Sequence, residues 1–133
     1  MDWINNQSGG SSETVLHDIS STSTIVGWSS YTTKKILYTI SGNVLTLFMH
    51  IEGDSNSSQA NFTLPDILGY SDIPKQWEEI KAINGGSSAV GYATLDTSSN
   101  IVRLYRTFSE ANWSSTGTKS CIGTVIFLVE PST

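Results

Sequence analysis

The chain has 133 residues, 12 acidic and 7 basic side chains and a formal net charge of −5, and only 14% of its residues are charged. Its largest basic cluster is Lys34-Lys35, so it lacks the electrostatic footprint of a nucleic-acid-binding protein. No run approaches the roughly 18 apolar residues that a membrane span needs, and membrane insertion is not expected.

The length fits a single domain. Residues 1–24 are rich in Ser, Gly, Asn and Thr, with apolar residues too sparse for a core, which predicts a flexible linker or stalk junction. Residues 25–133 are predicted to form the head domain. The start of the chain lacks the basic and apolar stretches of a secretory signal, so synthesis in the cytoplasm is expected. The single cysteine, Cys121, excludes an intramolecular disulfide.

From residue 25 onward, short segments of alternating apolar and polar residues are separated by Gly, Ser, Asn and Asp. The clearest pair is 34–40 and 44–52, joined by Ser41-Gly42-Asn43, where glycine supplies the positive φ of a tight turn. This pattern predicts a β-hairpin, with one apolar face made by Ile36, Tyr38, Ile40, Leu45, Leu47, Met49 and Ile51.

Further strands are predicted at 60–64, which Pro65 ends, and in a second hairpin made by 89–95 and 101–108. Residues 66–76 resemble an irregular excursion. The stretch 77–83 fits helical and strand spacing, and the Asn84-Gly85-Gly86 turn after it favours a strand. The whole pattern predicts an all-β, antiparallel β-sandwich.

The last strand, predicted at 120–130, is apolar on both sides: Val125, Phe127 and Val129 on one, Ile122, Ile126 and Leu128 on the other. Antiparallel sheets usually keep one face in water, and a second layer covers only the other face. Symmetric self-association is therefore favoured over the alternative, a monomer in which a long loop covers this strand.

No constellation of catalytic residues is evident. His50 is expected to be a half-buried structural histidine and Cys121 a small buried hydrophobe. The acid pairs Glu78/Glu79 and Glu52/Asp54 are typical of a solvated strand edge. The loop from Asp54 begins like a calcium loop but has Gln59 where an EF-hand needs glycine, so no metal site is predicted.

Aromatic and polar residues in the loops offer the best candidates for ligand binding. Rings that stack on sugar faces, beside amides and carboxylates that bind hydroxyl groups, are typical of glycan sites. The alternative is that the tryptophans pack in the core. The predicted ligand-binding set is Tyr70, Asp72, Trp77, Glu110, Asn112 and Trp113.

The order of these features resembles the small C-terminal head domains of bacteriophage tail-fibre and receptor-binding proteins. The resemblance spans 25–130 and is carried by seven blocks of sequence. They are Trp28 before Lys34-Lys35-Ile36-Leu37-Tyr38, the segment 51–65, Ile83-Asn84-Gly85-Gly86, Gly91-Tyr92-Ala93, the strand 101–105, Asn112-Trp113, and Gly117-Thr118-Lys119-Ser120 with Gly123-Thr124.

The resemblance implies a homotrimeric, jelly-roll-like sandwich at the tip of a tail fibre, joined to the rest of that fibre. It also implies a virion protein, made in the bacterial host, that adheres to surface saccharides or another host receptor without enzymatic activity or an obligatory cofactor. Three other classes remain open: a carbohydrate-binding accessory module of a secreted enzyme, a structural virion protein without a ligand, and a small hydrolase that depends on His50.

Overall fold

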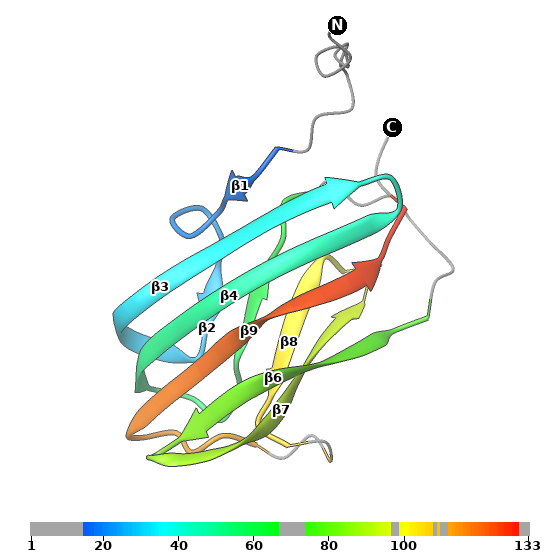
Figure 1. The fold of residues 1–133 in the computed structure, drawn as a ribbon. Coiled ribbons are helices and arrows are strands. Elements are labelled where there is room, and N and C mark those ends of the chain that lie inside the picture. Colours follow the sequence, from blue (N-terminus) through cyan, green and yellow to red (C-terminus); the bar gives the residue numbers. More distant parts are fainter. Residues whose placement is uncertain (1–14, 67–73, 97–98, 108, 110–111, 131–133) are drawn as a thin grey trace, which may run out of the picture.

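The structure is a computed structural model that describes residues 15–66, 74–96, 99–107, 109 and 112–130. Its regular secondary structure within these ranges consists of nine strands (Figure 1). The strands are β1 (His17–Asp18), β2 (Ile25–Val26), β3 (Trp28–Ser41), β4 (Val44–Ser55), β5 (Asn61–Thr63), β6 (Gln76–Asn84), β7 (Ser87–Asp96), β8 (Ile101–Tyr105) and β9 (Thr118–Leu128). The prediction of an all-β fold is confirmed.

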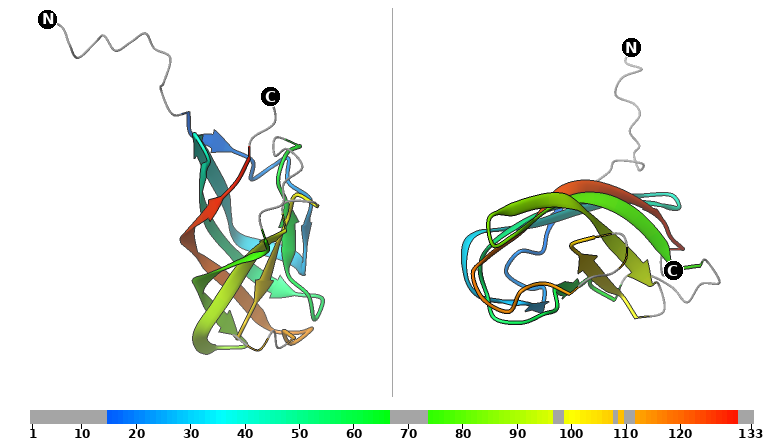
Figure 2. Two further views of the ribbon diagram at one scale, coloured as in Figure 1. Left: turned by 90° about the vertical axis from the view of Figure 1, so that its right-hand side faces the viewer. Right: turned by 90° about the horizontal axis from the view of Figure 1, so that it is seen from below.

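The strands form one sheet in the order β1-β3-β4-β9-β6-β7-β8-β5-β2, and every neighbouring pair is antiparallel. The sheet curls over on itself (Figure 2). One layer contains β3, β4, β9 and β6, the other contains β8, β5 and β2, and β7 leads from the first to the second. The core lies between the layers, which gives the antiparallel sandwich that the alternating pattern predicted.

The hairpin of β3 and β4 confirms the clearest prediction from the sequence. Its turn contains Gly42 with φ of 59°, a conformation that glycine adopts without strain. Alternate residues of β4 point inward, and their side chains are completely buried: Leu45, Leu47, Met49 and Ile51. The ambiguous stretch 77–83 is a strand within β6, and β7 pairs with β8 as the second predicted hairpin.

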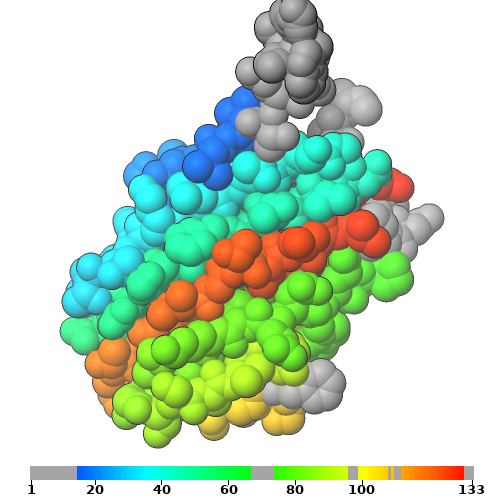
Figure 3. Space-filling model, viewed as in Figure 1, coloured from blue at the N-terminus to red at the C-terminus, as the bar shows by residue number. Residues whose placement is uncertain are grey.

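The predicted two-sided character of the last strand is also confirmed. Val125 and Phe127 of β9 are buried in the core, whereas Ile126 and Leu128 on the outer side are 55% and 56% exposed. Figure 3 shows β9 as a continuous band on this surface, between β4 and β6. A single subunit therefore leaves the outer side of β9 in contact with water.

Strand β9 is paired with β4 along its whole length, but with β6 only from Lys119 to Ile122. Beyond Ile122 the two strands diverge (Figure 1). At the far end of this gap, where β6 begins and β9 ends, the side-chain amide of Gln76 connects the two strands. Its Nε2 donates to the carbonyl oxygen of Leu128 (2.7 Å), and its Oε1 accepts from the Leu128 backbone N–H (2.9 Å).

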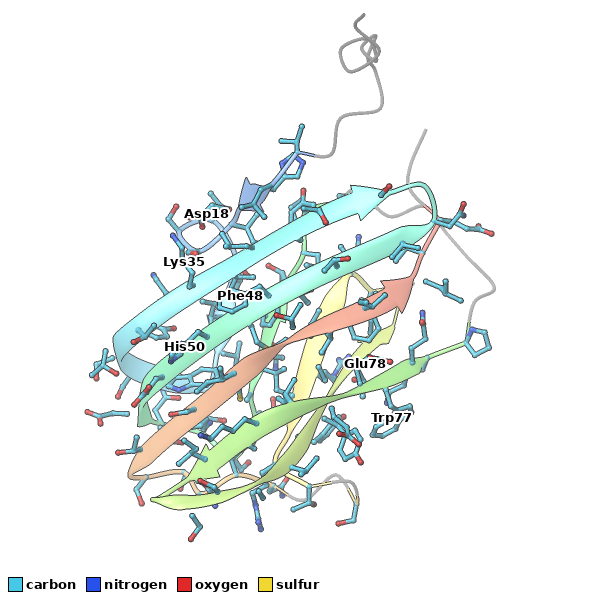
Figure 4. All side chains as sticks on the ribbon, in the orientation of Figure 1. Asp18, Lys35, Phe48, His50, Trp77 and Glu78 are labelled. Atoms are coloured by element: carbon cyan, nitrogen blue, oxygen red, sulfur yellow. The ribbon has the colours of Figure 1, made fainter. Side chains whose placement is uncertain are left out.

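The range 1–24, predicted as a linker, contains a segment that packs on the sheet. β1 pairs with β3, and Ile19 is only 6% exposed and belongs to the core. Lys35 Nζ lies 2.8 Å from a carboxylate oxygen of Asp18 (Figure 4). Hydrogen bonds from Lys35 and Ser20 hold the pKa of Asp18 well below its ordinary value. The sequence did not predict this packing, because the segment has few apolar residues. A single isoleucine, Ile19, is enough to anchor it.

Candidate binding groove

The structure describes three of the six residues predicted to bind a ligand. Trp77 projects from the outer side of β6 and is 36% exposed (Figure 4), and Asn112 is exposed in the segment before β9. Trp113 is 4% exposed, and its indole N–H donates to the carbonyl of Leu104 (3.0 Å), so this ring packs in the core. Tyr70, Asp72 and Glu110 lie outside the described residues.

A cavity of about 280 Å³ lies where three segments meet: the approach to β5, strand β8, and the approach to β9. We call it the β5–β8 groove. It brings Asn112 and Trp113 of the predicted set together with residues that the sequence did not single out for binding. Its lining residues are Ser58, Gln59, Ala60, Asn61, Arg103, Leu104, Tyr105, Asn112 and Trp113.

Trp77 adjoins the groove through Tyr105. The two rings are stacked, with centroids 5.9 Å apart and planes at 27°, and Tyr92 meets Trp77 edge-on at 6.5 Å. Tyr105 and Tyr92 are direct partners in the pairing of β8 with β7. Three rings from three adjacent strands thus form an aromatic platform beside the cavity. Alternation along 101–105 predicts that Arg103 and Tyr105 share the outer face of the sheet. This alternation is the sequence feature that could have identified both as candidate binding residues.

Several polar side chains of the groove are uncommitted. The side chains of Gln59, Asn61, Arg103 and Asn112 make no hydrogen bond or ion pair with any other residue that the structure describes. Polar groups that fold into a concave surface without protein partners can exchange water for the polar groups of a ligand. The groove therefore has the amide and guanidinium donors of a binding site.

A buried lysine, Lys119, supports two of the residues that line the groove. Lys119 is completely buried, and its Nζ donates to the carbonyl oxygens of Gly27 (2.9 Å), Ser57 (2.9 Å) and Gln59 (2.8 Å). The ammonium also lies 4.9 Å from the ring centroid of Trp28 and 5.6 Å from that of Trp113. Because Gln59 and Trp113 line the groove, these contacts fix two parts of its wall.

Gly27 allows this arrangement. Its φ is 127°, and a Cβ at this position would lie 2.5 Å from the carbonyl oxygen of Gln59 and 3.0 Å from Lys119 Nζ. A side chain here would enter the space that the ammonium and its acceptor occupy. Position 27 must therefore be glycine if the Lys119 ammonium is to occupy this place.

Burial lowers the pKa of Lys119 from its ordinary 10.5 to about 8, because desolvation disfavours the ammonium. The carbonyls and indole faces favour the ammonium, which predominates at neutral pH. Between the two values the unfolded chain binds more protons than the folded chain, so this group makes stability rise with pH.

We therefore expect the free energy of unfolding of the wild type, measured in urea, to rise relative to that of Lys119→Met as the pH increases from about 8 towards 10.5. Burial raises the pKa of Cys121 and keeps its thiol protonated over this pH range in both folded proteins, so Cys121 contributes the same pH dependence to each. Parallel pH profiles for the two proteins would contradict the expectation.

Four hydrogen bonds to its backbone groups hold the 112–114 segment against the groove. The Trp113 N–H donates to the carbonyl of Ser58 (3.0 Å), and the Ser55 hydroxyl donates to the carbonyl of Ser114 (2.7 Å). The Ser114 N–H donates to the side-chain oxygen of Asn84 (3.0 Å), and Arg106 Nε donates to the carbonyl of Asn112. The groove is therefore built on a fixed backbone.

The residues weighed for catalysis lie elsewhere. His50 is on the outer side of β4, with Nε2 3.3 Å from a carboxylate oxygen of Glu52, and Cys121 is buried. Across the described ranges, no three His, Cys, Asp or Glu side chains are grouped so that they could hold a metal ion. The same ranges contain no helix long and apolar enough to cross a membrane.

The geometry of the groove indicates what kind of ligand it could bind. It combines an exposed aromatic platform, uncommitted amides and a guanidinium on a rigid sheet, which suits noncovalent binding of a polar ligand that has a ring. No protein-family model matches the sequence, and no curated protein matches it.

Proposed function

We propose that the chain is a non-catalytic adhesion head of a bacteriophage tail fibre, which acts as a homotrimer and binds bacterial surface saccharides in the β5–β8 groove. The observation that carries the proposal is the aromatic platform beside a cavity lined by uncommitted polar side chains. A sugar ring can stack on Trp77, while Asn61 and Asn112 offer amide groups to its hydroxyls.

The position of the groove supports this role. Strand β1, through which the chain enters the domain, lies at one end of the sandwich, and the segments 56–60 and 112–117 lie towards the other end (Figure 1). Ser58, Gln59 and Asn112 of the groove belong to these segments. A head joined to a fibre at the β1 end would present the groove towards the cell surface.

The outer side of β9 supports the proposed trimer. Ile122, Ile126 and Leu128 form a stripe with Val44 and Phe48 of β4, and we call these five residues the outer stripe. Exposed apolar surface of this kind is typical of an interface. The stripe lies on the layer that contains β4 and β9, whereas the groove is built on β5 and β8. Association through the stripe therefore leaves the cavity accessible, whereas Trp77 lies on β6, in the same layer as the stripe.

The test is adsorption of the labelled full chain to a panel of bacterial strains. We expect saturable adsorption to particular strains, and loss of most of it in Trp77→Ala, because the stacking ring is removed. His17→Ala is the matched control: its exposed ring, on β1, stacks on Tyr38 of β3, neither residue lines the groove, and adsorption should persist.

Each contrary outcome points to another class of protein. Absence of adsorption to every strain would favour a structural virion protein without a ligand. Monomeric chains that bind a soluble polysaccharide but no cells would favour an accessory module of an enzyme. Release of sugar fragments, abolished by His50→Ala, would favour a hydrolase.

A further inference from the structure

We propose that the β5–β8 groove selects acidic saccharides and that Arg103 binds their anionic group. The inference rests on the proposed function, which assigns saccharide binding to this groove, and it adds the charge of the ligand. It depends on three observations: a lining arginine without an ion pair to any described residue, two further cations at the edge of the groove, and the absence of acids among the described lining residues.

Arg103 is placed to receive an anion. It is the central residue of β8, paired with Thr94 of β7 on one side and Asn61 of β5 on the other, so its backbone is held on both sides. It is exposed and is one of the residues that line the cavity, and its side chain has no ion pair or hydrogen bond with any residue that the structure describes. A guanidinium presents two parallel N–H groups that match the two oxygens of a carboxylate or a phosphate.

Three of the seven basic residues of the chain gather at this place. Arg103 lines the groove, Arg106 donates to the carbonyl of Asn112 at its edge, and Lys75 Nζ lies 5.0 Å from the centroid of the Trp77 ring. The described residues that line the groove include no acid; Glu79, on the outer face of β6, lies outside the cavity and pairs with Tyr92 of the aromatic platform. In a chain with net charge −5, a locally cationic groove attracts anions that the rest of the surface repels.

The remaining lining suits the neutral part of such a ligand. Gln59, Asn61 and Asn112 can bind hydroxyl groups, and the Trp77–Tyr105 stack can hold a sugar ring. The volume of about 280 Å³ is near the lower end for small-molecule sites, about 300 Å³, so the groove fits a short segment of a polysaccharide. The ligand class is therefore a saccharide that carries a carboxylate or a phosphate.

The inference is tested by calorimetric titration of the full chain with three soluble probes: an oligogalacturonate, a sugar phosphate oligomer, and a neutral oligogalactoside of the same length. We expect at least one acidic probe to bind at least about tenfold more tightly than the neutral probe. In Arg103→Gln, affinity for that probe should fall about ten- to a hundredfold, and affinity for the neutral probe should fall by less than about threefold. The acidic probe that binds more tightly identifies carboxylate or phosphate as the source of the charge.

Lys34→Gln is the matched control, since it removes one positive charge from β3, where Lys34 lies over the ring of Tyr31. Its affinity for the acidic probe should equal that of the wild type. Equal binding of neutral and acidic probes, an Arg103→Gln variant that behaves like the wild type, or no binding of either acidic probe would each overturn the inference. Adsorption to cells that persists alongside any of these results would leave the proposed function standing, so the two failures are distinguishable.

Discussion

Lys119→Met is expected to lower the free energy of unfolding by about 1–3 kcal/mol, the usual cost of leaving a buried hydrogen-bond acceptor without its donor. Methionine fills most of the volume but donates no hydrogen bond. The Gln59 carbonyl oxygen would then lose its donor, whereas the carbonyls of Gly27 and Ser57 would keep the Asn56 N–H (3.1 Å) and the Ser55 hydroxyl (3.2 Å). Equilibrium unfolding in urea measures the difference.

Lys35→Met provides the control, because it makes the same chemical change at an exposed lysine that pairs with Asp18 on the surface. Exposed ion pairs contribute little to stability, so this variant should unfold close to the wild type. Similar urea midpoints for Lys119→Met and Lys35→Met would show that the buried lysine does not support the fold in the way we describe.

Ile126→Asp is expected to convert the proposed trimer into monomers at micromolar concentration. Ile126 is 55% exposed in one subunit, so the change should leave the subunit folded. In a trimer packed through the outer stripe, it would remove about 1.5–3 kcal/mol of apolar burial per subunit and would also bury a carboxylate. At about 1.4 kcal/mol for each tenfold change, association should weaken by about a hundredfold or more. Multi-angle light scattering measures the mass.

The matched control is Val26→Asp. Val26 is also exposed, at 39%, but it lies on β2 at the far edge of the other layer. This variant should keep the mass of the wild type. A wild type that is already monomeric, or an Ile126→Asp variant that stays trimeric, would show that the outer stripe does not hold the subunits together.

Strand positions could be predicted from the sequence because side chains alternate between the two faces of a strand. This period of two is visible in β4, where Leu45, Leu47, Met49 and Ile51 alternate with half-buried residues. It was less decisive in β6, where helical spacing fits the apolar residues as well. The order of strands in the sheet could not be predicted, since it depends on pairing between distant segments such as β4 with β9.

The groove was only partly predictable for the same reason. Trp77 and Asn112 stood out as an aromatic and an amide in polar surroundings, but the cavity forms from residues 58–61, 103–105 and 112–113, which come together only in the folded sheet. Lys119 was missed, although it shares the inward phase of Cys121, Val125 and Phe127. A cation in phase with core residues is a signal for a buried lysine.

The amide of Gln76 has a consequence for how copies of the chain can meet. Where β6 and β9 separate, each presents a stretch of backbone without a ladder partner, and such an edge can template the addition of a foreign strand. Gln76 occupies both the N–H and the carbonyl of Leu128 at the open end. One side chain thus makes the backbone of Leu128, at the open end of the gap, unavailable to a foreign strand.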